Sequence, residues 1–201
     1  KKGDITVDYY ITDFVNQVVV DWENSQQISF YDLKGKSIAK SFQVEVNYQL
    51  VKQLNLRTAY KFYDVSTDFT SGNFQKALLP KHRFFANLSY DTEAQENGSQ
   101  WKYDMTYNLI GKQRLPNTSS NPIQYQLPEY SNSYNLLNAQ VTKVFSKRFE
   151  IYVGGENLTN TKQKNPILAS DNPFGASFDT SIIYAPIFGR MFYSGLRFKL
   201  D

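Results

Sequence analysis

Eight segments of the sequence alternate apolar and polar residues, and this pattern constrains the fold more than any other feature. The clearest segment, 101–109, puts Trp101, Tyr103, Met105, Tyr107 and Leu109 on one face and polar residues on the other. The other seven segments are 5–12, 42–50, 54–63, 84–91, 137–145, 149–156 and 192–200. Because successive side chains of a β-strand point to opposite faces, each segment predicts a strand with one apolar and one polar face. No comparable stretch has helical periodicity, so the sequence predicts an all-β fold.

The connections between these segments are of two kinds. Short links lie around 51–53 and 146–148 and a modest one near 92–99, whereas long ones span about 21–37, 68–80, 112–133 and 161–187. All seven prolines fall in or at the edge of the long connections, which supports the assignment because proline cannot donate to a strand ladder. Short turns at one rim and long loops at the other are typical of outer-membrane barrels. The sequence therefore predicts an antiparallel transmembrane β-barrel with its apolar faces toward lipid.

Composition excludes several other classes of protein. The mean hydropathy is −0.51 and no apolar run approaches the roughly 18 residues of a membrane helix. With 22 Lys and Arg against 19 Asp and Glu, the charge is too balanced to indicate nucleic acid as a partner. The chain has no cysteine and a single histidine, His82, so thiol catalysis, Ser-His-Asp relays and histidine metal sites lack their parts. We expect no catalytic residue, metal or cofactor, and hence no enzyme.

Two groups of residues are candidates for function. Charged side chains on the polar faces would line the lumen of a barrel, where they either pair with one another or contact a plug or a passing solute; they are Glu45, Arg57, Lys61, Asp104, Glu156 and Arg197. Aromatic residues in the long connections either grip a ligand or pack the loops together; the candidates for substrate binding are Trp22, Tyr125, Tyr130 and Phe174.

Two motifs near the end of the chain resemble those of a known family. The stretch Val153-Gly154-Gly155-Glu156-Asn157-Leu158-Thr159-Asn160 is similar to a penultimate strand, and Gly189-Arg190-Met191-Phe192-Tyr193-Ser194-Gly195-Leu196-Arg197-Phe198 to a final strand, of TonB-dependent outer-membrane receptors. The form is like that of the Bacteroidetes members. Shorter likenesses at 4–10, 80–83 and 110–113 extend the resemblance over essentially the whole chain. Asp201 follows Leu200 where many members stop on an aromatic residue.

This resemblance implies a fold and a function. Residues 1–201 would supply about the last eight strands of a 22-strand barrel in the bacterial outer membrane, and the plug domain and earlier strands would lie elsewhere. Such receptors bind a scarce solute with extracellular loops and import it with energy from TonB, ExbB and ExbD. The implied partners are therefore this energy-coupling system, outer-membrane lipid, a surface lipoprotein, and a small solute, glycan or peptide.

Two alternatives make different predictions. A complete eight-strand outer-membrane barrel with a structural or adhesive role has an interior just wide enough for side chains. Inward residues such as Arg57, Lys61, Tyr152 and Arg197 would crowd that interior. A soluble lipocalin-type barrel would have short loops and a polar exterior, which the long connections and the aromatic faces disfavour.

Overall fold

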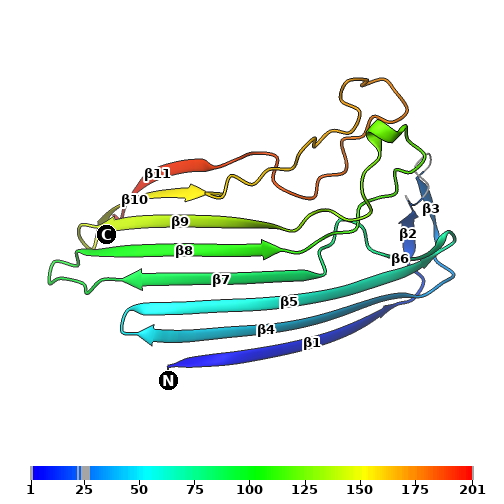
Figure 1. Ribbon diagram of the computed structural model, residues 1–201. Coiled ribbons are helices and arrows are strands. Elements are labelled where there is room, and N and C mark those ends of the chain that lie inside the picture. The colour runs from blue at the N-terminus through cyan, green and yellow to red at the C-terminus, as the bar shows by residue number, and fades with distance from the viewer. Residues whose placement is uncertain (1, 22, 24–27, 201) are drawn as a thin grey trace.

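The protein forms one curved antiparallel sheet of eight long strands (Figure 1). The computed structural model describes residues 2–21, 23 and 28–200. In the order of the sheet, the strands are β1 (Gly3–Phe14), β4 (Ser37–Val51), β5 (Leu54–Phe69), β7 (His82–Asp91), β8 (Gln100–Ile110), β9 (Tyr134–Val144), β10 (Phe149–Glu156) and β11 (Met191–Phe198). Each strand overlaps one predicted segment, so the all-β, antiparallel prediction is confirmed.

Three short strands lie in or beside the predicted long connections. Strands β2 (Val18–Asp21) and β3 (Ser29–Asp32) pair with each other, and β6 (Gly72–Gln75) pairs with the end of β5. Strand β4 also begins at Ser37 rather than near residue 42, and β5 continues to Phe69. The predicted strand segments 42–50 and 54–63 were therefore too short at this end, whereas the predicted connection 68–80 lies within two residues of the observed one. A single turn of 3-10 helix, Ile123–Tyr125, lies in the connection between β8 and β9.

The short and long connections lie at opposite ends of the sheet. The links 52–53, 92–99 and 145–148 and both chain termini lie at one end, here called the turn end (Figure 1). The other end, called the loop end, carries loop 1 (15–36), loop 2 (70–81), loop 3 (111–133) and loop 4 (157–190). Every proline lies in loops 2, 3 or 4. The predicted asymmetry of the connections is confirmed.

Strand register joins the apolar faces into one surface, called the outer face. One row of directly paired residues runs Tyr90, Tyr103, Val141 and Val153 across four strands. Ile5 and Leu196, on the first and last strands of the sheet, are 70% and 68% exposed. Large apolar side chains extend over this whole face, and no other part of the described protein covers them. Such a surface suits contact with lipid rather than water. The opposite surface, called the inner face, carries the polar set.

Aromatic side chains mark both rims of the outer face. At the turn end, the rings of Trp101 and Tyr103 stack with centroids 6.3 Å apart. Lys143, the one charged residue in the predicted apolar face of its strand, puts Nζ 4.9 Å from the Trp101 ring and 3.0 Å from the Ser99 hydroxyl. Nearer the loop end, the Tyr60 hydroxyl lies 2.7 Å from Nδ1 of His82. Aromatic residues at two levels are typical of membrane interfaces, and the long lysine side chain reaches polar partners from an apolar face.

Two glycines in the last two strands make room for tyrosine rings. Gly154 pairs with Tyr193, and Tyr152 pairs with Gly195, across β10 and β11. A Cβ on either glycine would overlap the ring of the tyrosine opposite. The glycines of the two motifs therefore permit close aromatic packing between strands.

The sheet is open in the part of the chain that the structure describes. Strands β1 and β11 each pair with only one neighbour in the main sheet, so no closed eight-strand barrel forms. Unpaired edges of this length are not tolerated in lipid, and further strands are needed to satisfy them. No helix among the described residues is long and apolar enough to cross a membrane.

Candidate functional site

The charged residues predicted to face the lumen all lie on the inner face, in strands β4, β5, β8, β10 and β11. Within this set the structure brings Glu45 and Arg57 together, with Arg57 Nε donating to Glu45 Oε1 at 3.0 Å. Asp104 accepts hydrogen bonds of 3.1 Å from the amide of Asn87, and Arg197 pairs with Glu150. These four members of the predicted set pair with neighbours on the same face. Their contact with a lumen, plug or solute remains a prediction.

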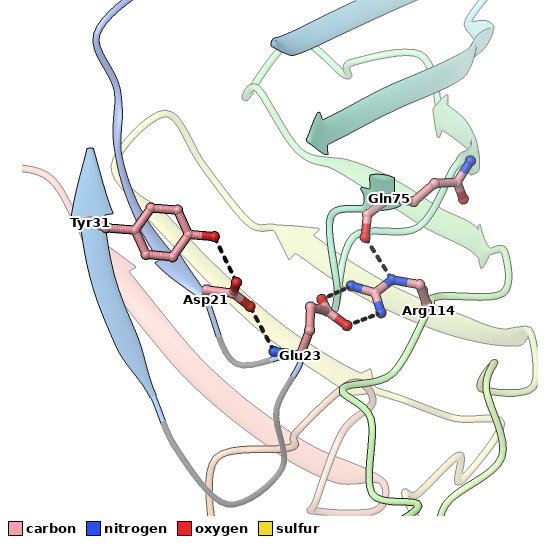
Figure 2. A network of polar contacts seen from close by, with 5 residues as sticks. All are labelled: Asp21, Glu23, Tyr31, Gln75 and Arg114. Carbon is pink, nitrogen blue, oxygen red and sulfur yellow. Dashed lines mark hydrogen bonds and ion pairs between the residues drawn. The ribbon is translucent and has the colours of Figure 1, made fainter. Parts of the chain in front are cut away.

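At the loop end, Arg114 of loop 3 connects loops 1 and 2 (Figure 2). Its guanidinium forms a two-pronged ion pair with Glu23 of loop 1, and Nε donates to the backbone carbonyl of Gln75 at 2.6 Å. The side chains of Arg114 and Glu23 are only 9% and 4% exposed. The guanidinium also lies 5.3 Å from the ring of Phe74. A buried charge needs a partner and hydrogen bonds, and this site supplies both.

A second group of hydrogen bonds orders loop 1 beside this ion pair. Asp21 accepts from the backbone N–H of Glu23 at 3.0 Å and from the hydroxyl of Tyr31 at 2.7 Å (Figure 2). The Tyr31 oxygen in turn accepts from the backbone N–H of Thr70 at 3.1 Å. Loop 1 is thereby bonded to loop 2 directly, through Tyr31 and Thr70, as well as indirectly through Arg114 of loop 3.

Two buried glutamines fix loop 4. Gln113 of loop 3 donates to the carbonyl of Tyr184 at 2.8 Å. Gln163 donates to the carbonyl of Ile182 at 2.8 Å and accepts from the N–H groups of Tyr184 and Ala185 at 2.8 and 3.2 Å. A side-chain amide has both donors and an acceptor, so one buried glutamine satisfies several backbone groups of a long loop.

The asparagine of the penultimate-strand motif shapes the start of loop 4. Asn157 has a positive φ of 50°, which asparagine tolerates better than most residues. Its side chain donates to the carbonyls of Thr161 and Phe188 at 2.8 and 3.1 Å and accepts from the N–H of Thr161 at 2.9 Å. The same asparagine therefore connects the beginning of loop 4 to its end.

The structure brings the predicted substrate-binding aromatic residues only partly together. Tyr125 of loop 3 donates to Asp171 of loop 4 at 2.6 Å, and this hydrogen bond raises the pKa of the tyrosine. Tyr130 is 42% exposed beside Arg114, and Phe174, three residues beyond Asp171, is fully exposed. Trp22 lies outside the described residues. Contact of these side chains with a solute remains a prediction.

Sequence reasoning missed the residues that hold the loops together. Glu23 and Arg114 are 91 positions apart, and no local pattern indicates their pairing. Gln113 and Gln163 are equally inconspicuous in the sequence. The only signal that could have indicated this ion pair is the presence of opposite charges in two long connections expected at the same rim. Several pairs of residues share that signal, so it does not single out Glu23 and Arg114.

The family model described as TonB dependent receptor-like, beta-barrel matches residues 1–158. No curated protein matches the chain.

Similar solved structures include the copper transporter OprC, with 12% identity and a TM-score of 0.71 over 100% of this chain and 29% of that one. BauA, the ferric preacinetobactin receptor from Acinetobacter baumannii, has 11% identity and a TM-score of 0.61 over 98% of this chain and 27% of that one. The ferripyoverdine receptor of the outer membrane of Pseudomonas aeruginosa has 14% identity and a TM-score of 0.63 over 98% of this chain and 25% of that one. At this identity the likeness shows the fold, and the chain spans less than a third of the length of each structure.

The matched family is one of receptors, so the prediction that the chain is not an enzyme is confirmed. The predicted resemblance to TonB-dependent outer-membrane receptors is confirmed as well, from the match over 1–158 and from the shared fold, whereas the Bacteroidetes-like form stays a prediction. The chain therefore belongs to the β-barrel family of TonB-dependent receptors, a family of the bacterial outer membrane.

Proposed function

We propose that residues 1–201 form the C-terminal portion of the barrel of an active transport receptor. The complete receptor binds a scarce solute with its extracellular loops and imports it with energy delivered by TonB, ExbB and ExbD. A plug domain and the earlier strands come from the rest of the receptor. The family match, the open sheet and the small share of each similar structure that the chain covers support this proposal.

The arrangement of loops 1 to 4 is the observation that carries the proposal. All four loops lie at one end of the sheet, and Gln113 and Arg114 of loop 3 bond to the other three. A recognition surface that is already ordered loses less entropy when a solute binds. Tyr125, Tyr130 and Phe174 are at least partly accessible on this surface, and we propose them as solute contacts.

Uptake by cells that carry the full-length receptor tests the transport step. The panel contains ferric siderophores and copper, because structurally similar proteins are named for these solutes, together with a glycan and a peptide. We expect receptor-dependent accumulation of one class of solute, and its loss when TonB is absent. Uptake of that solute at the same rate without TonB contradicts active transport.

A loop variant tests the proposed recognition surface. Replacing 118–126 by a short glycine and serine linker removes Tyr125 but keeps the backbone bonds between Leu115 and Glu129 and between Gln113 and Ser131. We expect weaker solute binding with normal assembly in the outer membrane. Unchanged binding removes this part of loop 3 from the site.

A further inference from the structure

Lys143 of β9 is the one charged residue that the described strands carry at or between the two aromatic rims of the outer face. It pairs with Trp101 on β8 and with Ile151 on β10, and both of these residues belong to that face. The next outer residue toward the turn end is Phe145, which is 46% exposed and stacks on Phe149 with ring centroids 5.5 Å apart. Lys143 therefore lies within the apolar part of the outer face and not beyond its edge.

The ammonium group of Lys143 has one hydrogen-bond partner among the described residues. Nζ donates to the hydroxyl of Ser99, a buried residue, at 3.0 Å. Nζ also lies 4.9 Å from the centre of the Trp101 ring and 5.9 Å from that of Phe145. No carboxylate of the described residues forms an ion pair with it. Because an ammonium group has three N–H donors, two donors and the whole charge are left for another partner.

The indole of Trp101 provides another donor beside this ammonium group. Trp101 is 42% exposed, and its hydrogen bonds with the described residues involve only its backbone. An indole N–H can donate but cannot accept. A cation in apolar surroundings without a counter-ion is unfavourable. The lysine and the indole therefore indicate an anion that comes from outside the described residues.

The position of Lys143 in the sheet identifies the source of that anion. Strand β9 is already paired on both sides, with β8 and β10, so the further strands of a barrel join the sheet at β1 and β11. A group inside the barrel contacts the inner face, whereas Lys143 lies on the outer face, where lipid is the neighbour. Aromatic rims mark the level of the lipid headgroups, and short turns face the periplasm in outer-membrane barrels. The nearest anions are therefore the phosphates of the periplasmic leaflet.

We propose that Lys143 and Trp101 bind the phosphate of one anionic phospholipid in the periplasmic leaflet. The ammonium group, held by Ser99, donates to the phosphate oxygens, and the indole N–H donates to the same headgroup. An anionic headgroup is preferred, because the lysine repels the cation of a zwitterionic one. This inference goes beyond the proposed transport, since the lipid site needs neither a solute nor TonB.

Lipid binding to the full-length receptor, measured by native mass spectrometry in detergent, tests the proposal. The probes are phosphatidylglycerol and phosphatidylcholine with the same acyl chains. Lys143→Met keeps the apolar stem of the side chain but removes the charge. We expect it to weaken the binding of one phosphatidylglycerol about fivefold, the effect of one lysine on an anionic lipid, and to change the binding of phosphatidylcholine by less than about twofold. Lys143→Arg keeps the charge and should leave both affinities within about twofold.

Lys102 provides a matched control for this test. It follows Trp101 on β8 and pairs with Thr142, the residue before Lys143, so it has nearly the same level but lies on the inner face. Lys102→Met should leave the binding of both lipids within about twofold. An equal loss in Lys102→Met, an equal loss of both lipids in Lys143→Met, or no loss at all overturns the proposal. A map of the full-length receptor in which a protein carboxylate lies against Lys143 overturns it as well.

Discussion

Replacing Arg114 by methionine should release the long connections from one another. The substitution keeps an apolar side chain of similar length but removes the ion pair with Glu23 and the 2.6 Å hydrogen bond to the carbonyl of Gln75. Glu23, whose side chain is 4% exposed, is then a buried carboxylate without a cation. Removing one partner of a buried pair costs about 3–5 kcal/mol. We expect this cost to appear in the local stability of the loop end.

Hydrogen exchange of the full-length receptor measures that local stability. The amides of Leu78 and Leu115 donate to Arg114 and Glu129 across the loop cluster, each at 2.8 Å. If opening of the cluster governs their exchange, a loss of 3–5 kcal/mol accelerates it between about a hundredfold and a few thousandfold. Amides in the middle of β8 should exchange at their original rate, because that strand is paired on both sides.

Two further variants decide whether burial of the pair is the cause. Arg197→Met breaks the pair with Glu150, in which the arginine side chain is 62% exposed, and should cost less than about 1 kcal/mol. The double variant Glu23→Leu with Arg114→Met buries no unpaired charge, and it should regain much of the lost protection. Equal exchange in the single and double variants, or equal effects of Arg114→Met and Arg197→Met, refutes the reasoning.

Three more outcomes follow from single residues. Gly154→Val should lower the free energy of unfolding by about 1–3 kcal/mol in a denaturant titration, because its side chain overlaps a tyrosine ring of β11. The amide of Asn73 lowers the pKa of Asp68 at the loop end, below its usual 3.8. Protection of the β5–β6 turn should therefore be constant above about pH 5 and be lost as the pH falls through that lowered pKa; Asp68→Asn should remove this dependence. The pKa of Tyr125, raised by its hydrogen bond to Asp171, should return toward 10.0 in Asp171→Asn, as NMR titration would show.

The eight long strands were predictable because each of them carries its own signal. In β8, Trp101, Tyr103 and Met105 lie two residues apart, and the alternation alone assigns them to one face. Register then follows, since a slip of one residue would move an apolar face onto the inner side. The pairing of Tyr103 with Val141 and of Met105 with Ala139 shows this matching.

The loop contacts were not predictable from local patterns. Gln113 bonds to Tyr184 over 71 positions and Arg114 to Glu23 over 91, so their geometry depends on where the whole sheet places the loops. Strands β2 and β3 have only four residues each, and their hairpin gains stability from the loop contacts around it. For the same reason, the predicted aromatic site was assigned by residue type, without the contacts that order the loops.

The end of the third predicted strand segment, at residue 63, came too early for a different reason. The same reason locates the membrane boundary. Alternation continues beyond Phe62, but the apolar residues change from the outer to the inner face, so a single apolar face ends there. Phe42 of β4 pairs with Phe62, and the next residues on that face, Lys40 and Asp64, pair with each other. Lys40 also pairs with Ile11, the last apolar residue on the outer face of β1. Because independent stretches of sequence change polarity at the same level, that level is the outer edge of the apolar band.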